Sequence, residues 1–249
     1  MRSAGAELRA RMQAGRVHGL FVKLADRTVI ELASAAFDFL VVDREHAQLS
    51  ERDALALIAH GAAVEVPTLL RLPELDGGQV NRALEAGAAG IQLSSVRDAD
   101  TVHAMRASCE YPPRGRRSIS LAHKGAGHGA MALEDYLAAS AGAALVVAQI
   151  ESALTPAAYA AIIAAKPDVA FVGTTDLLVD CGLDAARAAR HLEEIAAAAR
   201  EADVVLGGFA LAEREDVGYV IGASDVSLLG AGMRAAVPSN HIEEVADED

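Results

Sequence analysis

Residues 169–177 read Val-Ala-Phe-Val-Gly-Thr-Thr-Asp-Leu, and this stretch decides the fold that we expect. It begins as the β-branched and aromatic run of a buried strand and then changes to a glycine, two hydroxyls and the carboxylate of Asp176. A second apolar run, residues 144–150, is followed directly by Glu151. If both runs are parallel strands of one sheet, the two carboxylates lie at the same edge. Such a pair suits a hard divalent cation, Mg²⁺ or Mn²⁺, which takes oxygen ligands and is completed by substrate and water.

Strand, polar terminus and helix recur in this order along the whole chain. We expect strands at residues 20–25, 37–42, 64–70, 90–96, 144–150, 169–172, 204–209 and 225–229. We expect helices at residues 4–14, 27–36, 50–60, 76–87, 98–108, 133–141, from 156 onwards, 185–202 and 213–221. About eight strand-helix units are the number in a TIM (β/α)8 barrel. The strands are also continuous apolar runs, as in a parallel sheet covered by helices.

A doubly wound open sheet is the alternative architecture. It usually carries a glycine-rich phosphate turn after its first strand, and residues 20–27 contain no G-x-G-x-x-G motif. No linker divides the repeating units. We therefore predict an α/β protein with a single (β/α)8-barrel domain over residues 1–249.

Composition narrows the class of protein. The chain has 249 residues, of which 52% are hydrophobic and 23% charged, so it can bury a large core and disorder is not expected. A net charge of −13 argues against a nucleic-acid partner. Cys109 and Cys181 form neither a disulfide framework nor a zinc motif, which favours a cytoplasmic location. No signal peptide or membrane-spanning apolar run is seen, so we expect no membrane partner.

Polar side chains follow several of the predicted strands, where a TIM barrel places its catalytic residues. They are Asp43, Glu45, His46, Arg71, Gln149, Glu151 and Asp176. Each has a plain structural alternative, since a carboxylate after a strand is often the N-cap of the next helix. His46 could be a core histidine bonded to a backbone carbonyl, and Arg71 could be the structural partner of Asp43. The coincidence of several such residues at one face of the barrel favours a functional site.

Five motifs resemble the HpcH/HpaI aldolase family of metal-dependent class II pyruvate aldolases, such as 4-hydroxy-2-oxoheptanedioate and 2-dehydro-3-deoxyglucarate aldolases. They are Phe-Asp-Phe-Leu-Val-Val-Asp-Arg-Glu-His at 37–46, Leu-Arg-Leu-Pro at 70–73, Tyr-Pro-Pro-Arg-Gly-Arg-Arg-Ser at 111–118, Gln-Ile-Glu at 149–151 and Phe-Val-Gly-Thr-Thr-Asp-Leu at 171–177. The resemblance covers nearly the whole chain. It implies a (β/α)8 barrel that assembles into homohexamers and cleaves or forms 4-hydroxy-2-oxo acids through a pyruvate enolate.

The resemblance also implies roles for the catalytic residues. Glu151 and Asp176 would hold a divalent cation, Mg²⁺ or Mn²⁺ with Co²⁺ as a further candidate. His46 would be the base, acting through a metal-bound water, and Asp43 belongs to the same catalytic group. Arg71 would hold the oxygen that becomes the enolate. These roles agree with the chemistry, because a cation and a fixed guanidinium stabilise the negative charge of an enolate.

For the substrates, the resemblance implies that Gln149 and Arg71 contact the donor 2-oxo acid, whose carboxylate would rest on the backbone amides of Thr175 and Asp176. We expect the basic loop at residues 116–128 to face the acceptor aldehyde. Family members commonly carry Gly where this chain has Arg44, and proline where it has serine near residue 94. The donor and acceptor pockets can differ accordingly.

Our leading hypothesis is a metal-dependent aldolase whose partners are a small 2-oxo acid and an aldehyde. A lyase similar to the citrate lyase β-subunit, acting on an acyl-CoA, is one alternative. A non-catalytic barrel that binds a 2-oxo acid is another, because a fold does not establish a function. No lysine follows any of the predicted strands, which counts against an aldolase that works through a Schiff base.

Overall fold

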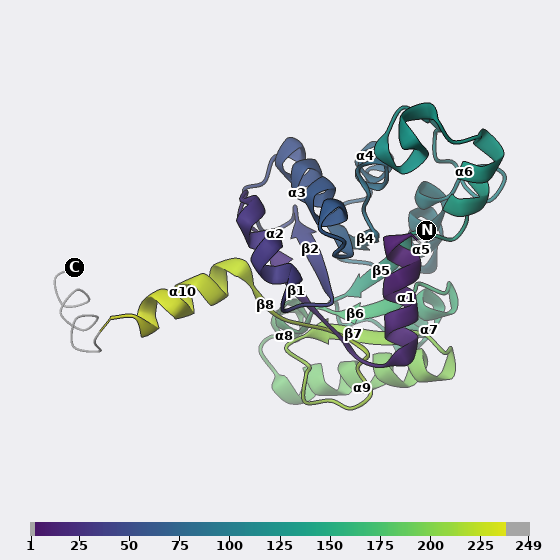
Figure 1. Ribbon diagram of the computed structural model, residues 1–249. Coiled ribbons are helices and arrows are strands. Elements are labelled where there is room, and N and C mark those ends of the chain that lie inside the picture. Colours follow the sequence, from purple (N-terminus) through teal and green to yellow (C-terminus); the bar gives the residue numbers. More distant parts are fainter. Residues whose placement is uncertain (1–2, 238–249) are drawn as a thin grey trace.

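Eight parallel strands close into one barrel in the computed structural model, which describes residues 3–237 (Figure 1). Each strand pairs with its neighbours in chain order, and β8 pairs with β1 to close the sheet. The strands are β1 (Val17–Val22), β2 (Phe39–Asp43), β3 (Thr68–Leu72), β4 (Gly90–Leu93), β5 (Leu145–Ile150), β6 (Val169–Val172), β7 (Val205–Phe209) and β8 (Tyr219–Ser224). The prediction of a TIM barrel is confirmed.

Helices connect the strands and cover the outside of the barrel. They are α1 (Ala4–Ala14), α2 (Arg27–Ser34), α3 (Glu51–Ala63), α4 (Gly77–Ala86), α5 (Ala99–Cys109), η1 (Lys124–Gly129), α6 (Leu133–Ser140), α7 (Pro156–Ala164), α8 (Thr174–Asp180), α9 (Ala185–Glu201) and α10 (Asp225–Ala235). Several begin as their sequences predict. Ser50 and Asp53 form a capping box at the start of α3, and Asp76 caps α4, which ends at Gly87 with φ of 108°.

Two layers of apolar side chains hold the barrel together. One fills the space between the strands and the helices, and the other fills the inside of the barrel. Inside, the rings of Phe39 and Tyr219 stack with their centroids 4.2 Å apart. Gly19 makes room for this pair, since a Cβ at that position would lie 2.2 Å from the Phe39 ring. The interior is therefore a packed core, and ligands are confined to the ends of the strands.

The predicted secondary structure is wrong at two places that matter for the site. Strand β1 covers Val17–Val22 instead of residues 20–25, so it ends three residues earlier than expected. The predicted helix at 213–221 and strand at 225–229 are reversed, because Tyr219–Ser224 is β8 and Asp225–Ala235 is α10. A capping box between Ser224 and Ser227 starts α10 and ends the strand before it.

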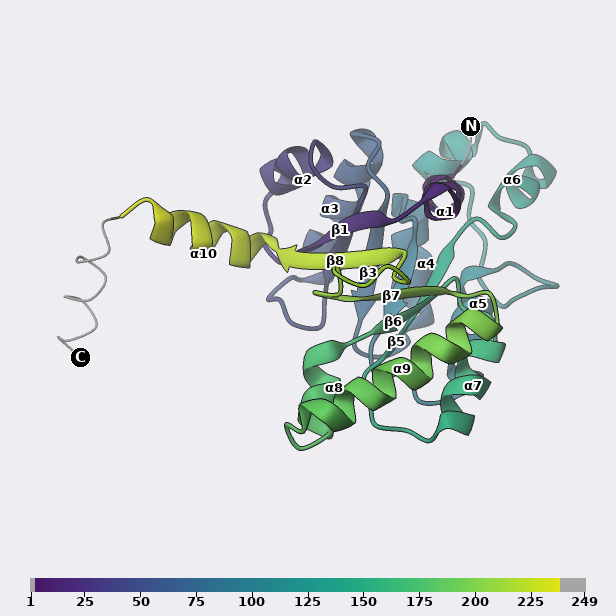
Figure 2. The ribbon, with the colours of Figure 1, turned by 90° about the horizontal axis from the view of Figure 1, so that it is seen from below.

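The last helix, α10, extends away from the barrel instead of lying against it (Figure 2). The segment with η1 and α6 projects from the other side of the molecule, far from α8 (Figures 1 and 2). None of the helices in residues 3–237 combines the length and the apolar character needed to cross a membrane.

Candidate active site

A cavity of about 300 Å³ opens where the strands end. It is lined by Phe21, Lys23, His46, Arg71, Gln149, Phe171, Gly173, Thr174, Thr175, Asp176, Phe209 and Ser224. The predicted residues His46, Arg71, Gln149, Thr175 and Asp176 therefore share one cavity. Asp43 lies behind Arg71, and Glu151 lies against Gly173. The structure thus gathers the predicted side chains at one end of the barrel.

A buried ion pair joins the ends of β2 and β3. Asp43 and Arg71 are register partners on these strands, and their side chains are 0% and 6% exposed. Arg71 donates from Nε to Oδ1 of Asp43 at 2.9 Å and from Nη2 to Oδ2 at 2.6 Å. The guanidinium also lies 4.2 Å above the ring of Phe21. Asp43 takes two of the five guanidinium N–H groups, so Arg71 keeps others for a ligand in the cavity.

The environment of Asp43 lowers the pKa of its carboxyl group. Burial by itself raises this pKa, because it disfavours the charged form. The hydrogen bonds and charge of Arg71, together with the backbone N–H groups of His46 and Glu45, outweigh burial and bring the pKa from 3.8 to about 2. Asp43 is therefore a fixed anion, and its role is to hold Arg71.

Glu45 connects Arg71 with His46. Its Oε2 lies 3.1 Å from Nη1 of Arg71 and accepts a hydrogen bond from Ser94 Oγ. The same oxygen lies 3.6 Å from Nε2 of His46. The His46 side chain is 57% exposed, so it is a solvent-accessible residue at the cavity and the alternative of a core histidine is wrong. An imidazole in this place can exchange protons with a ligand.

Glu151 is buried among neutral hydrogen-bond donors. Its Oε1 accepts from the backbone N–H of Ser95 at 2.7 Å and from Ser95 Oγ at 2.8 Å. Its Oε2 accepts from Gln149 Nε2 at 2.5 Å, and Gln149 Oε1 in turn accepts from Gln92 Nε2 at 2.6 Å. These donors fix the carboxylate in place and leave its negative charge uncompensated.

In the described residues, the cations near the site form no ion pair with Glu151 or Asp176. Within the described residues, the ion pairs of Lys23, Arg71 and His46 go to Asp43 and Glu45. Gly173 allows Glu151 to pack closely against the backbone of the cavity wall, because a Cβ at this position would lie 2.5 Å from Oε2. Glu151, which is fixed, and Asp176, which is exposed at the cavity, thus lack a positive partner from this part of the chain.

This donor set fits a hard divalent cation. In residues 3–237, no group of three or more His, Cys, Asp and Glu side chains that could hold a metal ion is found, so the protein would supply at most two carboxylates here. Mg²⁺ and similar cations are usually held by one or two carboxylates, with substrate and water completing the ligands. The residues that would hold such a cation here are Glu151 and Asp176.

Four cavity residues lie outside the motifs that the sequence analysis singled out, namely Phe21, Lys23, Phe209 and Ser224. The expectation that no lysine follows a strand is wrong, since β1 ends at Val22 and Lys23 comes next. Lys23 was not recognised as a cavity residue because the predicted strand, residues 20–25, included it. Ser224 was hidden because β8 was predicted as a helix. Correct strand ends would have revealed both residues.

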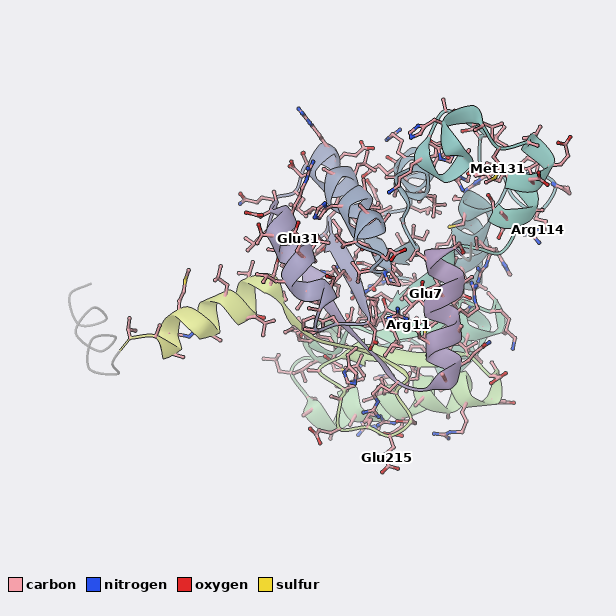
Figure 3. The ribbon with its side chains drawn as sticks, viewed as in Figure 1. Glu7, Arg11, Glu31, Arg114, Met131 and Glu215 are labelled. Carbon is pink, nitrogen blue, oxygen red and sulfur yellow. The ribbon has the colours of Figure 1, made fainter. Side chains whose placement is uncertain are left out.

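The basic loop does not reach the cavity of its own chain, so the expectation that it faces the acceptor is wrong for a single chain. None of residues 116–128 lines the cavity. Arg117 is instead buried, donates to Asn81 Oδ1 at 2.7 Å and lies 4.6 Å above the ring of Tyr111. Figure 3 shows the flanking residues Arg114 and Met131 at the end of the molecule formed by η1 and α6.

Comparison with known proteins gives consistent matches over most of the chain. Residues 17–237 match the family model described as HpcH/HpaI aldolase/citrate lyase. The 4-hydroxy-4-methyl-2-oxoglutarate aldolase cghB of Chaetomium globosum is 33% identical over 192 residues, which are 74% of this chain and 71% of the relative. The 4-hydroxy-2-oxo-heptane-1,7-dioate aldolase of Salmonella dublin is 29% identical over 238 residues, 90% of each chain.

A solved structure gives the same result. The crystal structure of an HpcH/HpaI aldolase/citrate lyase family protein from Burkholderia cenocepacia J2315 superimposes with a TM-score of 0.83 at 26% identity. The match covers 96% of this chain and 99% of that chain. The barrel and its order of elements are therefore shared over the full length of both proteins.

The low pKa of Asp43 predicts acid sensitivity that depends on this residue. Because the pKa is about 2 in the native state against an ordinary 3.8, Asp43 stabilises the fold above pH 4 and loses this contribution as the pH falls from about 4 to about 2. The contribution is roughly 2 kcal/mol. The free energy of unfolding, measured in urea at several pH values, should fall less steeply over this window in Asp43→Asn than in the natural chain. Equal slopes in the two proteins would contradict the assignment.

Proposed function

The chain belongs to the HpcH/HpaI aldolase/citrate lyase family, and from this membership we propose the reaction that it catalyses. It is a divalent-metal-dependent aldolase that reversibly cleaves 4-hydroxy-2-oxo acids into pyruvate, or a related 2-oxo acid, and an aldehyde. The observation that carries this proposal is a buried carboxylate, Glu151, held only by neutral donors and lying against Gly173 of the cavity wall, which also carries Asp176 and the fixed guanidinium of Arg71.

Arg71 stabilises the charge that develops when the donor loses a methyl proton. The oxygen of the donor keto group becomes an enolate oxygen, and the N–H groups that Asp43 leaves open can bind it. Asp43 keeps the guanidinium rigid, so little reorganisation is needed when the charge forms. A bound divalent cation would add positive charge beside the carboxylate and keto oxygens of the donor.

His46 moves the proton. Its imidazole is exposed at the cavity, and Glu45 lies close enough to orient it. Glu45 is itself held by Arg71 and Ser94, so the base and the enolate-binding group belong to one connected set of side chains. The neutral imidazole takes a proton from the donor and returns it in the reverse direction.

The donor carboxylate has a place at the start of α8. Gly173 precedes this helix, and no side chain caps its first turn, so the amides of Thr175 and Asp176 can face an anion. Gln149 lines the same wall and contacts the donor from the end of β5. These residues set the orientation in which the methyl group meets His46.

A Schiff-base aldolase is a second candidate, because Lys23 lies in the cavity. Its Nζ is 3.2 Å from Oδ2 of Asp43, where it forms an ion pair. An ammonium has no lone pair with which to attack a carbonyl carbon, so this geometry favours the metal-dependent route. A citrate lyase-like enzyme and a non-catalytic barrel that binds a 2-oxo acid are the third and fourth candidates.

One experiment separates the metal-dependent aldolase, the Schiff-base aldolase and the binding protein. The purified protein, supplied with Mg²⁺ or Mn²⁺, is incubated with pyruvate in D₂O, and exchange of the methyl protons is followed by NMR with and without a chelator. We expect exchange only with the cation present and no loss of activity on borohydride treatment with pyruvate. Exchange that resists the chelator, together with inactivation by borohydride, would establish the Schiff-base route. No exchange under any condition would support the binding protein.

Two variants distinguish the base from the metal ligand. His46→Ala should lower the exchange rate by about a hundredfold or more, as expected for a general base, with cation affinity nearly unchanged. Glu151→Ala should lose both the exchange activity and the cation affinity, because it removes one of the two carboxylates that would hold the cation. Cation affinity is measured by calorimetry on the apoprotein. A similar loss of affinity in both variants would contradict the role of His46.

We further propose that the chain assembles as a homo-oligomer, with the homohexamer implied by the family resemblance as the leading model. Large apolar side chains are exposed along and just after α10, which extends away from the barrel (Figure 2). They are Val226, Leu228, Leu229, Met233 and Val237. Large exposed apolar side chains gathered on one helix are typical of a protein–protein contact. A second copy of the chain is the occupant that we propose. The cytoplasmic location stays a prediction.

Charge on α10 should weaken this assembly. Leu228→Glu combined with Leu229→Glu should lower the molar mass measured by light scattering after size-exclusion chromatography, because two carboxylates would have to be buried in the contact. Leu183→Glu is the control, since Leu183 is 71% exposed and lies outside α10. A monomeric natural chain, or an unchanged mass in the α10 variant, would overturn the proposal.

A further inference from the structure

Lys23 is held in a defined position at the mouth of the barrel. Its backbone N–H donates to both carboxylate oxygens of Asp225, at 3.0 and 2.9 Å, and the N–H of Leu24 donates to Oδ2 at 2.9 Å. Asp225 is buried. The chain is therefore clamped directly after β1, and Lys23 is part of the cavity wall, not a loose surface lysine.

The ammonium group of Lys23 is also fixed. Its Nζ lies 3.2 Å from Asp43 Oδ2 and 3.4 Å from the carbonyl oxygen of His46. These acceptors use two of its three N–H groups, which leaves one for a ligand. The side chain is 23% exposed and lines the cavity, so this third donor is within reach of bound molecules.

The topology places Lys23 opposite the carboxylates that would hold the cation. Lys23 follows β1 and Glu151 follows β5, and these strands face each other across a closed barrel of eight. A donor bound at Glu151 and Asp176 leaves the β1 side of the cavity for the second reactant. Phe21 and Phe209, stacked with centroids 6.3 Å apart, give this side an apolar floor. This side of the cavity therefore combines an apolar surface with a cation.

We propose that Lys23 is a specificity-determining residue that binds the carboxylate of an acceptor aldehyde. This inference rests on the proposed aldolase function. Lys23 and Arg71 are the fixed cations on the cavity wall in the described part of the chain, and Arg71 is held by Asp43 and Glu45. A protein of net charge −13 needs a local cation to attract an anionic reactant. A single ammonium suits a carboxylate better than a phosphate dianion, which is usually held by several donors.

The test compares two four-carbon acceptors that differ in their terminal group, succinic semialdehyde with a carboxylate and butanal with a methyl group. Both are added to pyruvate with the natural chain and with Lys23→Met, which keeps an unbranched side chain, one heavy atom shorter, and removes the charge. We expect kcat/KM for succinic semialdehyde to fall roughly tenfold or more, mainly through KM, since one hydrogen bond to a charged group is lost. The value for butanal should change less than about twofold, within the spread of a neutral contact.

Two controls complete the design. Lys23→Arg should restore most of the preference for the charged aldehyde, because it restores the cation. Lys124→Met removes the same charge from an exposed residue of η1 outside the cavity, and should leave both acceptors unaffected.

The outcomes are distinguishable. If both aldehydes lose activity equally in Lys23→Met, Lys23 acts on Asp43 and Arg71 and the specificity role is wrong. If neither changes, or if glyceraldehyde 3-phosphate depends on Lys23 more than succinic semialdehyde does, the carboxylate assignment is wrong. Metal-dependent proton exchange of pyruvate without acceptor, measured on the same samples, reports the donor half of the reaction. If the natural chain shows no such proton exchange, the proposed function itself is refuted.

Discussion

The ion pair between Asp43 and Arg71 is the constraint on which the rest of the site depends. Two charged groups are buried at the ends of adjacent strands, where removal from water costs several kcal/mol per ion unless they are paired and hydrogen-bonded. The parallel register makes the pairing possible by placing the two residues side by side. Asp43 also accepts from the backbone N–H groups of Glu45 and His46 and contacts Lys23. One buried carboxylate therefore fixes a guanidinium, an ammonium and the turn that carries the imidazole.

The charged side chains around the cavity are balanced on one side and unbalanced on the other. On the β1 to β3 side, Asp43 and Glu45 face Arg71 and Lys23, so two anions are balanced by two cations. On the β5 and β6 side, Glu151 is surrounded by a hydroxyl, an amide and a backbone N–H, which hold its position without neutralising it. This asymmetry supports the divalent-cation site that we propose at Glu151 and Asp176. A balanced arrangement on both sides would give a cation no electrostatic reason to bind there. Ser95 and Gln92 belong to this second side, but a serine and a glutamine have no characteristic sequence pattern, so only the pairing of β4 with β5 reveals their function.

Strong local signals made most of the fold predictable from the sequence. The apolar runs of β5 and β6, the capping box of α3 and the proline at the start of α7 all act within a few residues, and these elements were located correctly. Prediction failed where the neighbours of an element decide it. Residues 20–25 are apolar enough to continue a strand, but β1 ends at Val22 because Asp225, about 200 residues later, captures the next backbone N–H groups. Lys23 could not be recognised as a cavity residue without that long-range contact.

Asp225 connects the cavity to the outside of the molecule. It is the first residue of α10, where its carboxylate accepts from the N–H of Val226. The same carboxylate accepts from the backbone N–H of Lys23, which follows β1. The buried start of α10 is thus part of the wall of the site, while the rest of the helix exposes its apolar side chains. One carboxylate, that of Asp225, therefore joins the start of α10 to the backbone of the proposed acceptor-binding residue Lys23.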